Sequence, residues 1–460
     1  MVNIETFQEA LAALNVLTGW PLIIYVLAAS IIYTVALRFL QFRYFANAWK
    51  YVFAPTKITG GSDKIIHMTT LQAFISTLSA NLGNGSVAGM ATALYSGGPG
   101  AAFWVLVVGV LLMVIRFAEV FLSIYYANTA STRSGLGGPM LYLRNVPGGH
   151  ILAGLYGFIA LCFGLTGGNG VQTNSISDSL HATWNIPYEI SAIALLIFVF
   201  YIVSGGAARI ARVSERLVPL KVATFFGSAF IILAYHYHAI IPALSLIWES
   251  AFHPVSIMGG AAGITVFTVQ QAMQFGINRS IFATETGLGT AGILFSSTGS
   301  EEPVKDGIMS MLSTFISTLV CFIVALCILV SGVLSEGLTS AQYGMPLTIA
   351  AFDTVFGHFG GWIVTFLAMT FGAGVLVSYA YITREVWLFL TGGRFEIIFN
   401  LIYCGVAFSA ALIKSETVWE AVGIIIAAML FINLYGMVCL IPIVRRALAA
   451  FESTHENDGK

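Results

Sequence analysis

Charged residues are scarce in this chain. Asp, Glu, Lys and Arg make up 9% of its 460 residues, against about 25% in a typical soluble domain. Apolar residues make up 58%, and the mean hydropathy is +0.88. The net charge of −1 and the lack of a basic tail indicate that nucleic acid is not a partner. The composition predicts a protein whose surroundings are the lipid bilayer.

Motifs for ATP-driven transport and for metal-dependent hydrolysis are absent from the sequence. It contains no GxxxxGK(S/T) loop and no HExxH pair, so neither ATP binding nor a metalloprotease site is expected. The cysteines show no CxxC or Cys/His metal spacing, and we expect buried thiols without disulfides. They are Cys162, Cys321, Cys327, Cys404 and Cys439. The sequence therefore predicts neither an enzyme nor a cofactor.

Long apolar runs dominate the chain, and a membrane-spanning helix needs about 20 such residues. On that criterion we predict an all-α, polytopic membrane protein with about eleven spans. The predicted spans are 20–41, 68–96, 101–126, 150–178, 188–206, 217–236, 259–296, 306–334, 360–383, 395–412 and 419–442. The segment 259–296 is too long for one straight helix, so we expect a break or an extra cytoplasmic helix within it.

Lys and Arg residues fall almost entirely in alternate connections between these spans. With the N-terminus outside, the inside connections hold nearly all of them, for example Arg209 and Arg212. The outside connections around 235–258 and 334–360 hold none. Because cytoplasmic loops are enriched in Lys and Arg, we predict a cell (inner) membrane protein with its N-terminus outside and its C-terminus in the cytoplasm.

Apart from the first span, the predicted spans divide into two sets of five. A repeat with an odd number of spans enters the membrane from the opposite side, so the two sets are expected to be inverted. The expected organisation is an amphipathic segment, an extra membrane helix and a cytoplasmic loop in 1–66, a first repeat in 67–240, a second repeat in 241–445, and a cytoplasmic tail in 446–460.

Each predicted repeat opens with an apolar stretch that glycine interrupts near its middle. The first interruption lies at 83–86 and the second at Phe275-Gly276. An unwound backbone in hydrocarbon is tolerated only where protein, a cavity or a ligand satisfies its polar groups. Paired broken helices therefore indicate a transporter binding site. The alternative is that these glycines only allow close helix packing.

Asn84 and Ser86 flank Gly85 in the first interruption. A helix N-terminus there would direct unpaired N–H groups at a carboxylate. Carbonyl oxygens of the preceding half-helix could receive an ammonium group or a cation. This arrangement suits a zwitterionic amino acid better than a sugar or a metal ion. The alternative, that Asn84 and Ser86 cap the half-helix, is compatible with binding.

Other polar residues within the spans have two interpretations. Gln172 lies among several amides and hydroxyls, which are costly in a membrane unless they are paired or face water. We weigh a role in lining the site against hydrogen bonding between helices. Phe275 is either an aromatic wall or ordinary packing. Arg279 and Glu285 are expected to make cytoplasmic-side polar contacts, with proton carriage by Glu119 or Glu285 as the alternative. Arg116, with an acidic residue three positions later, predicts an intrahelical ion pair.

Six motifs follow one another along nearly the whole chain. The segment 83–94 looks like GTGNIAGVATAI, 97–104 like GGPGAIFW, 137–140 like GGPM, 169–175 like NxxQxNS, 205–219 like GG-x-x-RI with LVP, and 276–291 like GVKRGIFSNEAGMGSA. Together they resemble the alanine or glycine:cation symporter family. The resemblance implies a leucine-transporter-like architecture, with two inverted five-helix repeats whose first helices are broken. It also implies sodium-coupled, sometimes proton-coupled, uptake of alanine, glycine or similar amino acids.

The sequence departs from this family where the related fold builds a sodium site. A Ser/Thr pair of the family aligns with Ala373 and Gly374 here. Since sodium needs several oxygen ligands, Thr370 or Ser378 would have to substitute. The predicted cation-binding residues are Gly83, Ser86, Thr370 and Ser378.

The resemblance and the residues together predict a secondary active transporter. It would import small neutral amino acids by cation symport, with sodium as the coupling ion and no cofactor. The alternatives are a proton-coupled or exchange transporter of the same fold, and an amino-acid sensor that does not transport. The predicted partners are the amino acid and the lipid bilayer, and no oligomeric state is indicated. The predicted substrate-binding residues are Asn84, Gly85, Ser86, Gln172, Phe275 and Gly276.

Overall fold

Helices form nearly all of the described structure, a computed structural model that describes residues 19–53, 68–129, 137–259, 263–334, 344–413 and 415–458. The first part of the chain forms α2 (Trp20–Ala36), α3 (Leu40–Arg43), α4 (Phe45–Phe53), α5 (Thr70–Asn81), α6 (Asn84–Gly97), α7 (Ala101–Thr129), α8 (Pro139–Tyr142), η1 (Leu143–Asn145), α9 (Gly149–Leu165), η2 (Thr166–Gly170), α10 (Val171–Trp184), α11 (Tyr188–Val203), α12 (Gly206–Tyr235) and α13 (Tyr237–Phe252).

A two-stranded antiparallel sheet separates this part from the rest of the chain. Its strands are β1 (Val255–Gly259) and β2 (Gly263–Phe267). The remaining elements are α14 (Val269–Thr284), α15 (Thr290–Ser296), α16 (Pro303–Val330), α17 (Met345–Phe356), α18 (Phe359–Thr391), α19 (Glu396–Ala410), α20 (Ser415–Cys439) and α21 (Ile441–Asp458). The predicted all-α class is confirmed, with these two strands as the exception among the described residues.

The outer surface of the bundle is apolar, as a membrane protein requires. Among the described residues, six helices are long and apolar enough to cross a membrane, and several shorter helices are also apolar. Large side chains such as Ile151, Ile397 and Phe230 are 78%, 75% and 72% exposed. In water such surfaces would aggregate, so they are the lipid-facing side of a polytopic membrane protein. The total of eleven spans and the inverted repeat remain predictions.

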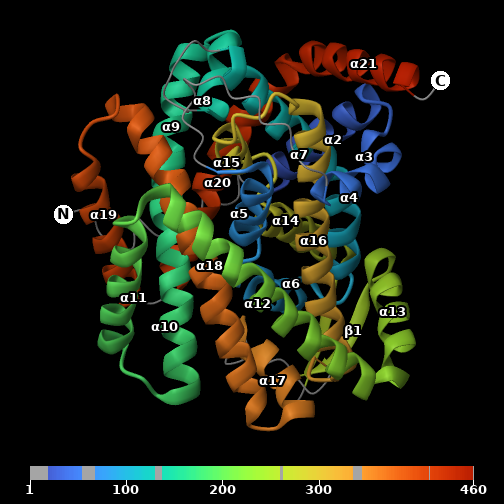
Figure 1. The fold of residues 1–460 in the computed structure, drawn as a ribbon. Helices are drawn as coiled ribbons and strands as arrows, with labels where there is room; N and C mark the ends of the chain where they lie inside the picture. Colours follow the sequence, from blue (N-terminus) through green and yellow to red (C-terminus); the bar gives the residue numbers. More distant parts are fainter. Residues whose placement is uncertain are drawn as a thin grey trace.

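Two ends of the bundle are distinguishable in Figure 1. Helices α8, α15 and α21 lie toward one end, whereas α17 and β1 lie toward the other. Helices α5, α14 and α16 occupy the middle of the view. The predicted long segment 259–296 is indeed divided, since it contains β2, α14 and α15. The arrangement therefore places the two glycine-containing segments of interest near the centre of the molecule.

The two central helices α5 and α14 begin in the same way. The Thr69 hydroxyl accepts a hydrogen bond from the Gln72 amide, and the Gln72 side chain accepts one from the Thr69 amide. Thr268 and Gln271 repeat this arrangement at the start of α14. Such reciprocal capping satisfies two N–H groups at a helix N-terminus. The two helices are thus fixed at their starts by identical residues at identical spacing.

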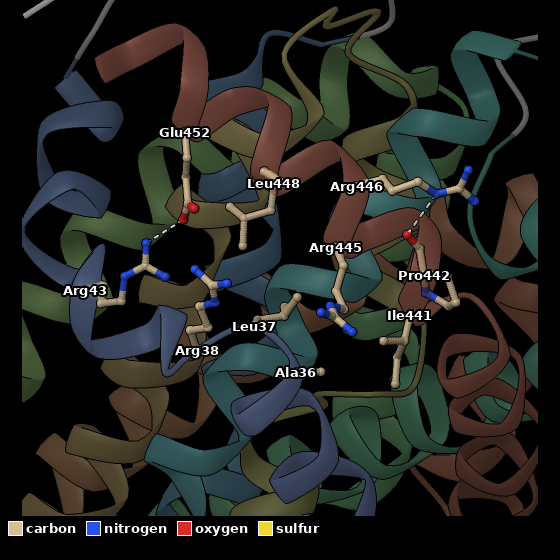
Figure 2. Close-up of a pocket in the computed structure, with 11 residues that line it drawn as sticks. Ala36, Leu37, Arg38, Arg43, Ile441, Pro442, Arg445, Arg446, Leu448 and Glu452 are labelled. Atoms are coloured by element: carbon tan, nitrogen blue, oxygen red, sulfur yellow. Dashed lines mark hydrogen bonds and ion pairs between the residues drawn. The ribbon is translucent and has the colours of Figure 1, made fainter. Parts of the chain in front are cut away.

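A cavity of about 450 Å³ lies at one end of the bundle, between the end of α2, α3 and α21. Figure 2 shows Arg38, Arg43 and Arg445 around it, with Arg43 paired to Glu452 at 2.5 Å. Its basic lining comes from segments that the Lys and Arg pattern assigns to the cytoplasmic side. The cavity contains neither glycine interruption, so the candidate site has to be sought elsewhere.

Candidate functional site

The first predicted interruption is confirmed. Helix α5 ends at Asn81 and α6 begins at Asn84, with Leu82 and Gly83 between them. Gly83 is extended, with φ −106° and ψ −179°. The helical ladder is therefore broken inside the bundle, and the end groups of two half-helices face each other across the gap.

The second interruption is not at Phe275-Gly276, and that prediction is wrong. Helix α14 runs without a break from Val269 to Thr284. A Cβ built on Gly276 would lie 2.5 Å from the Ala101 carbonyl oxygen and 2.7 Å from Trp104 Cβ. Glycine is needed there because α14 packs directly on the start of α7. The packing interpretation of this glycine is the right one.

The second interruption lies further along, at 285–289. Glu285 ends α14 in a left-handed conformation with φ 52°, and Gly287 and Gly289 have φ 85° and 92°. A left-handed non-glycine residue is uncommon and costs of order 1–3 kcal/mol. Helix α15 then resumes at Thr290. The second break therefore comes about one helical turn beyond the position that matches the first.

A small cavity of about 50 Å³ lies between the two breaks. Its walls come from α5, α6, α9, α10, α14 and α20 and from the turn η2 between α9 and α10. They consist of Ala80, Asn81, Gly83, Gly85, Ser86, Phe163, Gly167, Val171, Gln172, Arg279, Phe282, Ala283, Glu285, Val422 and Ile426. A cavity of this volume has room for a few water molecules or a compact ligand. It brings together Gly83, Gly85, Ser86 and Gln172 of the predicted site and leaves out Phe275 and Gly276.

Polar atoms at the first break lack partners. The side-chain amides of Asn81 and Asn84 are buried, and neither their nitrogen nor their oxygen atoms have a hydrogen-bond partner among the described residues. The Ser79 hydroxyl is in the same state. A buried polar group without a partner costs about 1–3 kcal/mol, and native structures contain few of them. Their concentration at one break indicates a site that a polar ligand completes.

Gln172 holds the first break open. Its Oε1 accepts a hydrogen bond from the Asn84 amide at 3.3 Å, and its Nε2 donates to the Gly167 carbonyl at 3.4 Å. Gly167 belongs to η2, one turn of π-helix, a feature often found at functional sites. Asn84 itself does not line the cavity. Its side chain faces α18, since a Cβ built on Gly372 would lie 2.9 Å from the Asn84 Nδ2.

The second break, by contrast, is satisfied by protein. Arg116 and Glu119 form the predicted ion pair at 3.1 Å, fully buried on α7. The Arg116 guanidinium donates to the Thr284 carbonyl, the last of α14. Glu119 accepts from the Gly287 amide at 2.9 Å and from the Gly292 amide at 3.3 Å. One ion pair therefore terminates α14 and caps α15.

Two further side chains complete this second break. The Asn433 amide donates to the Gly287 carbonyl at 2.7 Å, and the Tyr156 hydroxyl donates to the Leu288 carbonyl at 2.5 Å. The backbone of 285–289 thus has protein partners of its own. Of the two breaks, the first is the one with unpartnered amide groups available to a ligand.

Two opposite charges face the small cavity. Arg279 is 8% exposed, its guanidinium contacts Cys321, and its Nε has no hydrogen-bond partner among the described residues. Glu285 is 9% exposed and accepts a hydrogen bond from the Tyr379 hydroxyl at 2.6 Å. Within the described part of the chain, neither belongs to an ion pair. Buried charges are normally paired, so both have unused capacity for a ligand.

The Arg279 guanidinium packs against α6. A Cβ built on Gly89 would lie 1.7 Å from its Nη1, and one on Gly85 would lie 3.1 Å from its Nη2. The Gly85 amide, in the first turn of α6, has no hydrogen-bond partner among the described residues. A guanidinium and a helix N-terminus therefore converge on one corner of the cavity, where both favour an anion.

The predicted cation-binding residues do not converge. Gly83 and Ser86 line the cavity, and the Ser86 hydroxyl donates to the Asn81 carbonyl at 3.3 Å. Thr370 donates to carbonyls of its own helix, and Ser378 donates to the Ser76 carbonyl at 3.0 Å. Neither Thr370 nor Ser378 is among the residues that line the cavity. Their role in ion binding stays a prediction.

Comparison with known proteins identifies the family. A family model described as the sodium:alanine symporter family matches residues 4–460. The chain belongs to this family. It is therefore a membrane transporter of the symporter type and not an enzyme, and it carries out cation-coupled amino-acid transport.

Relatives of this symporter differ in the amino acid that their names give as substrate. The chain is 31% identical over 445 residues to an uncharacterized transporter of Haemophilus influenzae, covering 95% of each chain. It is 30% identical over 448 residues to the sodium/alanine symporter AgcS of Methanococcus maripaludis, covering 96% of each. It is 26% identical over 433 residues to a Bacillus subtilis protein named "Probable sodium/glutamine symporter GlnT", covering 93% of this chain and 87% of the relative.

Sequence reasoning missed the two charged residues of this symporter's cavity. The sequence predicts cytoplasmic-side polar contacts for Arg279 and Glu285, because the polar segment that contains them leads to an inside loop. The two capping boxes hold the missing signal. When Thr69 is matched with Thr268, the first break corresponds to positions just past Arg279, close to the glycines of 285–289. That alignment would have moved the second break and brought both charges into the site.

Proposed function

We propose that this symporter imports a small neutral amino acid, with alanine and glycine as its substrates, and that the cavity between the two breaks is its binding site. One observation carries the proposal. A buried guanidinium and a buried carboxylate, each without an ion-pair partner among the described residues, face the same small cavity. An amino acid is a zwitterion and supplies one counter-charge to each.

In the proposed complex, the substrate carboxylate lies between the Arg279 guanidinium and the Gly85 amide. The substrate ammonium lies toward the Glu285 carboxylate. Hydrogen bonds that involve a charged partner contribute about 1.5–3 kcal/mol each, and they are strongest where water is excluded. The charges thus fix the orientation of the backbone portion that all amino acids share.

The remaining walls select the substrate side chain. Phe163, Val171, Phe282 and Ile426 are apolar and line the cavity. A volume of about 50 Å³ leaves little room beyond the charged groups. An additional methylene in a tight apolar pocket changes affinity by about 1–3 kcal/mol. We therefore expect alanine and glycine to bind well and larger neutral amino acids to bind poorly.

The coupling ion and the sidedness are also part of the proposal. The names of the family and of its member AgcS support sodium, and the proton is the alternative that the sequence leaves open. The Lys and Arg pattern supports a cell (inner) membrane location with the N-terminus outside and the C-terminus in the cytoplasm. The division into repeats at 67–240 and 241–445 and the leucine-transporter-like architecture are proposed on the same footing.

Uptake into proteoliposomes tests the proposal. Uptake of labelled alanine and glycine is measured under a sodium gradient and under a proton gradient, each imposed separately. Accumulation under either gradient supports the proposed substrate class, and unlabelled glutamine should compete weakly. Binding of alanine without any flux under either gradient would indicate the sensor alternative. No binding of either amino acid would refute the proposed substrate class.

A matched pair of variants tests which wall selects the side chain. Phe282→Ala should admit larger neutral amino acids, because Phe282 lines the cavity. Phe275→Ala removes the same ring from the same helix but outside the cavity lining, so its selectivity should match that of the wild type. Equal changes in both variants would show that the cavity does not determine selectivity.

A further inference from the structure

A buried lysine contacts the end of the first half-helix. Lys221 of α12 is 0% exposed. Its Nζ donates to the carbonyl oxygens of Ser79 at 3.0 Å and of Leu82 at 2.9 Å. These carbonyls lie at the C-terminal end of α5, where a helix leaves C=O groups unsatisfied and carries partial negative charge. The break therefore presents the kind of environment in which a cation is stabilised, and a side chain of the protein supplies one.

Helix α18 closes the other side of this position. The Lys221 Nζ lies 5.4 Å from the centre of the Phe371 ring, within the range of a cation–π contact. A Cβ built on Gly374 would lie 2.7 Å from Nζ and 2.7 Å from the Ser79 hydroxyl oxygen. Glycine at 374 therefore provides the room that the ammonium occupies.

No acidic side chain accounts for the burial of this lysine. Within the described residues, Lys221 takes part in no ion pair. Burying an ammonium is costly unless it is paired and hydrogen-bonded. Its partners here are two main-chain carbonyls, the end of a half-helix and a ring face. These partners stabilise the ammonium directly, without a carboxylate beside it.

A sodium ion does not fit beside this ammonium. Ala373 and Gly374 offer no side-chain oxygen, and the hydroxyl of Thr370 is bonded to its own helix. Two monovalent cations about 4 Å apart, at an effective dielectric constant of about 20, repel enough to weaken the second by on the order of a thousandfold. The residues around Lys221 therefore disagree with the sodium in the family's name.

We propose that the Lys221 ammonium takes the place of a sodium ion at the first helix break, so that uptake by this chain does not require sodium. Two measurements test this proposal. Uptake of labelled alanine rests on the proposed amino-acid transport, whereas binding of radioactive sodium does not. Together, the two measurements distinguish a failure of this proposal from a failure of the substrate assignment.

The first experiment measures sodium directly. Purified wild-type protein in detergent is titrated with radioactive sodium, without amino acid. We expect no saturable binding. Saturable sodium binding to the wild type would overturn the proposal, whatever the substrate proves to be.

The second experiment measures transport. Proteoliposomes containing the wild type take up labelled alanine in sodium chloride or in choline chloride, and we expect equal initial rates. A loss of tenfold or more in choline would overturn the proposal. If neither alanine nor glycine accumulates in either medium, the proposed substrate class fails, and sodium binding still decides the role of Lys221.

A matched pair of lysine variants tests the ammonium itself. Lys221→Met keeps the length of the side chain and removes its charge, and we expect at least a tenfold loss of alanine uptake in both media. Lys305→Met is the control, because Lys305 is partly exposed and pairs with Glu302 at one end of α16; its uptake should match the wild type. Wild-type uptake by Lys221→Met in choline would overturn the proposal. If Lys221→Met does not fold, the wild-type measurements decide alone.

Discussion

Replacing Arg279 with methionine should separate substrate binding from folding. Arg279 is 8% exposed and has no carboxylate partner among the described residues. Removing a buried charge that lacks a counter-ion also removes its desolvation cost. We therefore expect the free energy of unfolding of the substrate-free protein to stay the same or rise. The proposed contact with the substrate carboxylate is lost, which at about 2 kcal/mol weakens binding about 30-fold.

Thermal unfolding with and without alanine measures both effects. Ligand at 100 times the wild-type Kd stabilises the native state by about 2.7 kcal/mol. The same concentration is about three times the Kd of Arg279→Met, and the stabilisation falls to about 0.9 kcal/mol. The variant should thus have an unchanged or raised Tm without alanine and a much smaller shift with it.

The neighbouring buried arginine provides the contrast. Arg116→Met leaves the Glu119 carboxylate buried without its cation. Breaking a buried ion pair in this way costs about 3–5 kcal/mol, so the Tm should fall while any remaining folded protein keeps its alanine shift. If Arg279→Met is destabilised as much as Arg116→Met and keeps its full alanine shift, Arg279 is a structural charge and the proposed site is wrong.

Three other substitutions test the same geometry. Gln172→Ala should lower alanine uptake about tenfold with intact expression, because the Asn84 amide loses its acceptor; wild-type uptake would remove Gln172 from the site. Gly85→Leu should abolish binding of labelled alanine, since a Cβ at this position would lie 3.1 Å from the Arg279 guanidinium and the rest of the leucine would fill the cavity. Size-exclusion chromatography should still show a folded protein. Gly276→Leu should instead destabilise the protein by about 1–3 kcal/mol in thermal unfolding, through contact with the α7 backbone. A changed alanine Kd in the folded fraction of Gly276→Leu would contradict the packing role.

The sequence predicts the class of fold well because the bilayer imposes strong rules. The length of the apolar runs and the scarcity of charged residues suffice to predict a polytopic helical membrane protein. The first break was also predictable, because two glycines and two polar residues at 83–86 interrupt an apolar run near its middle. The ion pair of Arg116 and Glu119 follows from a spacing of three on one helix.

The second break was not predictable from glycine alone. A glycine that permits contact with another backbone and a glycine that permits a left-handed turn look the same in a sequence. Gly276 is of the first kind, and Gly287 is of the second. The distinction depends on which helix lies opposite, and that is a tertiary property. The roles of Arg279, Glu285 and Lys221 were hidden for the same reason, since each depends on the exact place where a helix ends.

The ion pair on α7 has a mechanical consequence. Arg116 and Glu119 lie one turn apart on α7, and together they bind the Thr284 carbonyl at the end of α14 and the amides of Gly287 and Gly292 beyond it. A tilt of α7 would move residues 285–289 with it. We therefore expect α7 and the segment 285–289 to move together, and spectroscopic labels placed on α7 and α15 should keep a constant separation throughout the transport cycle.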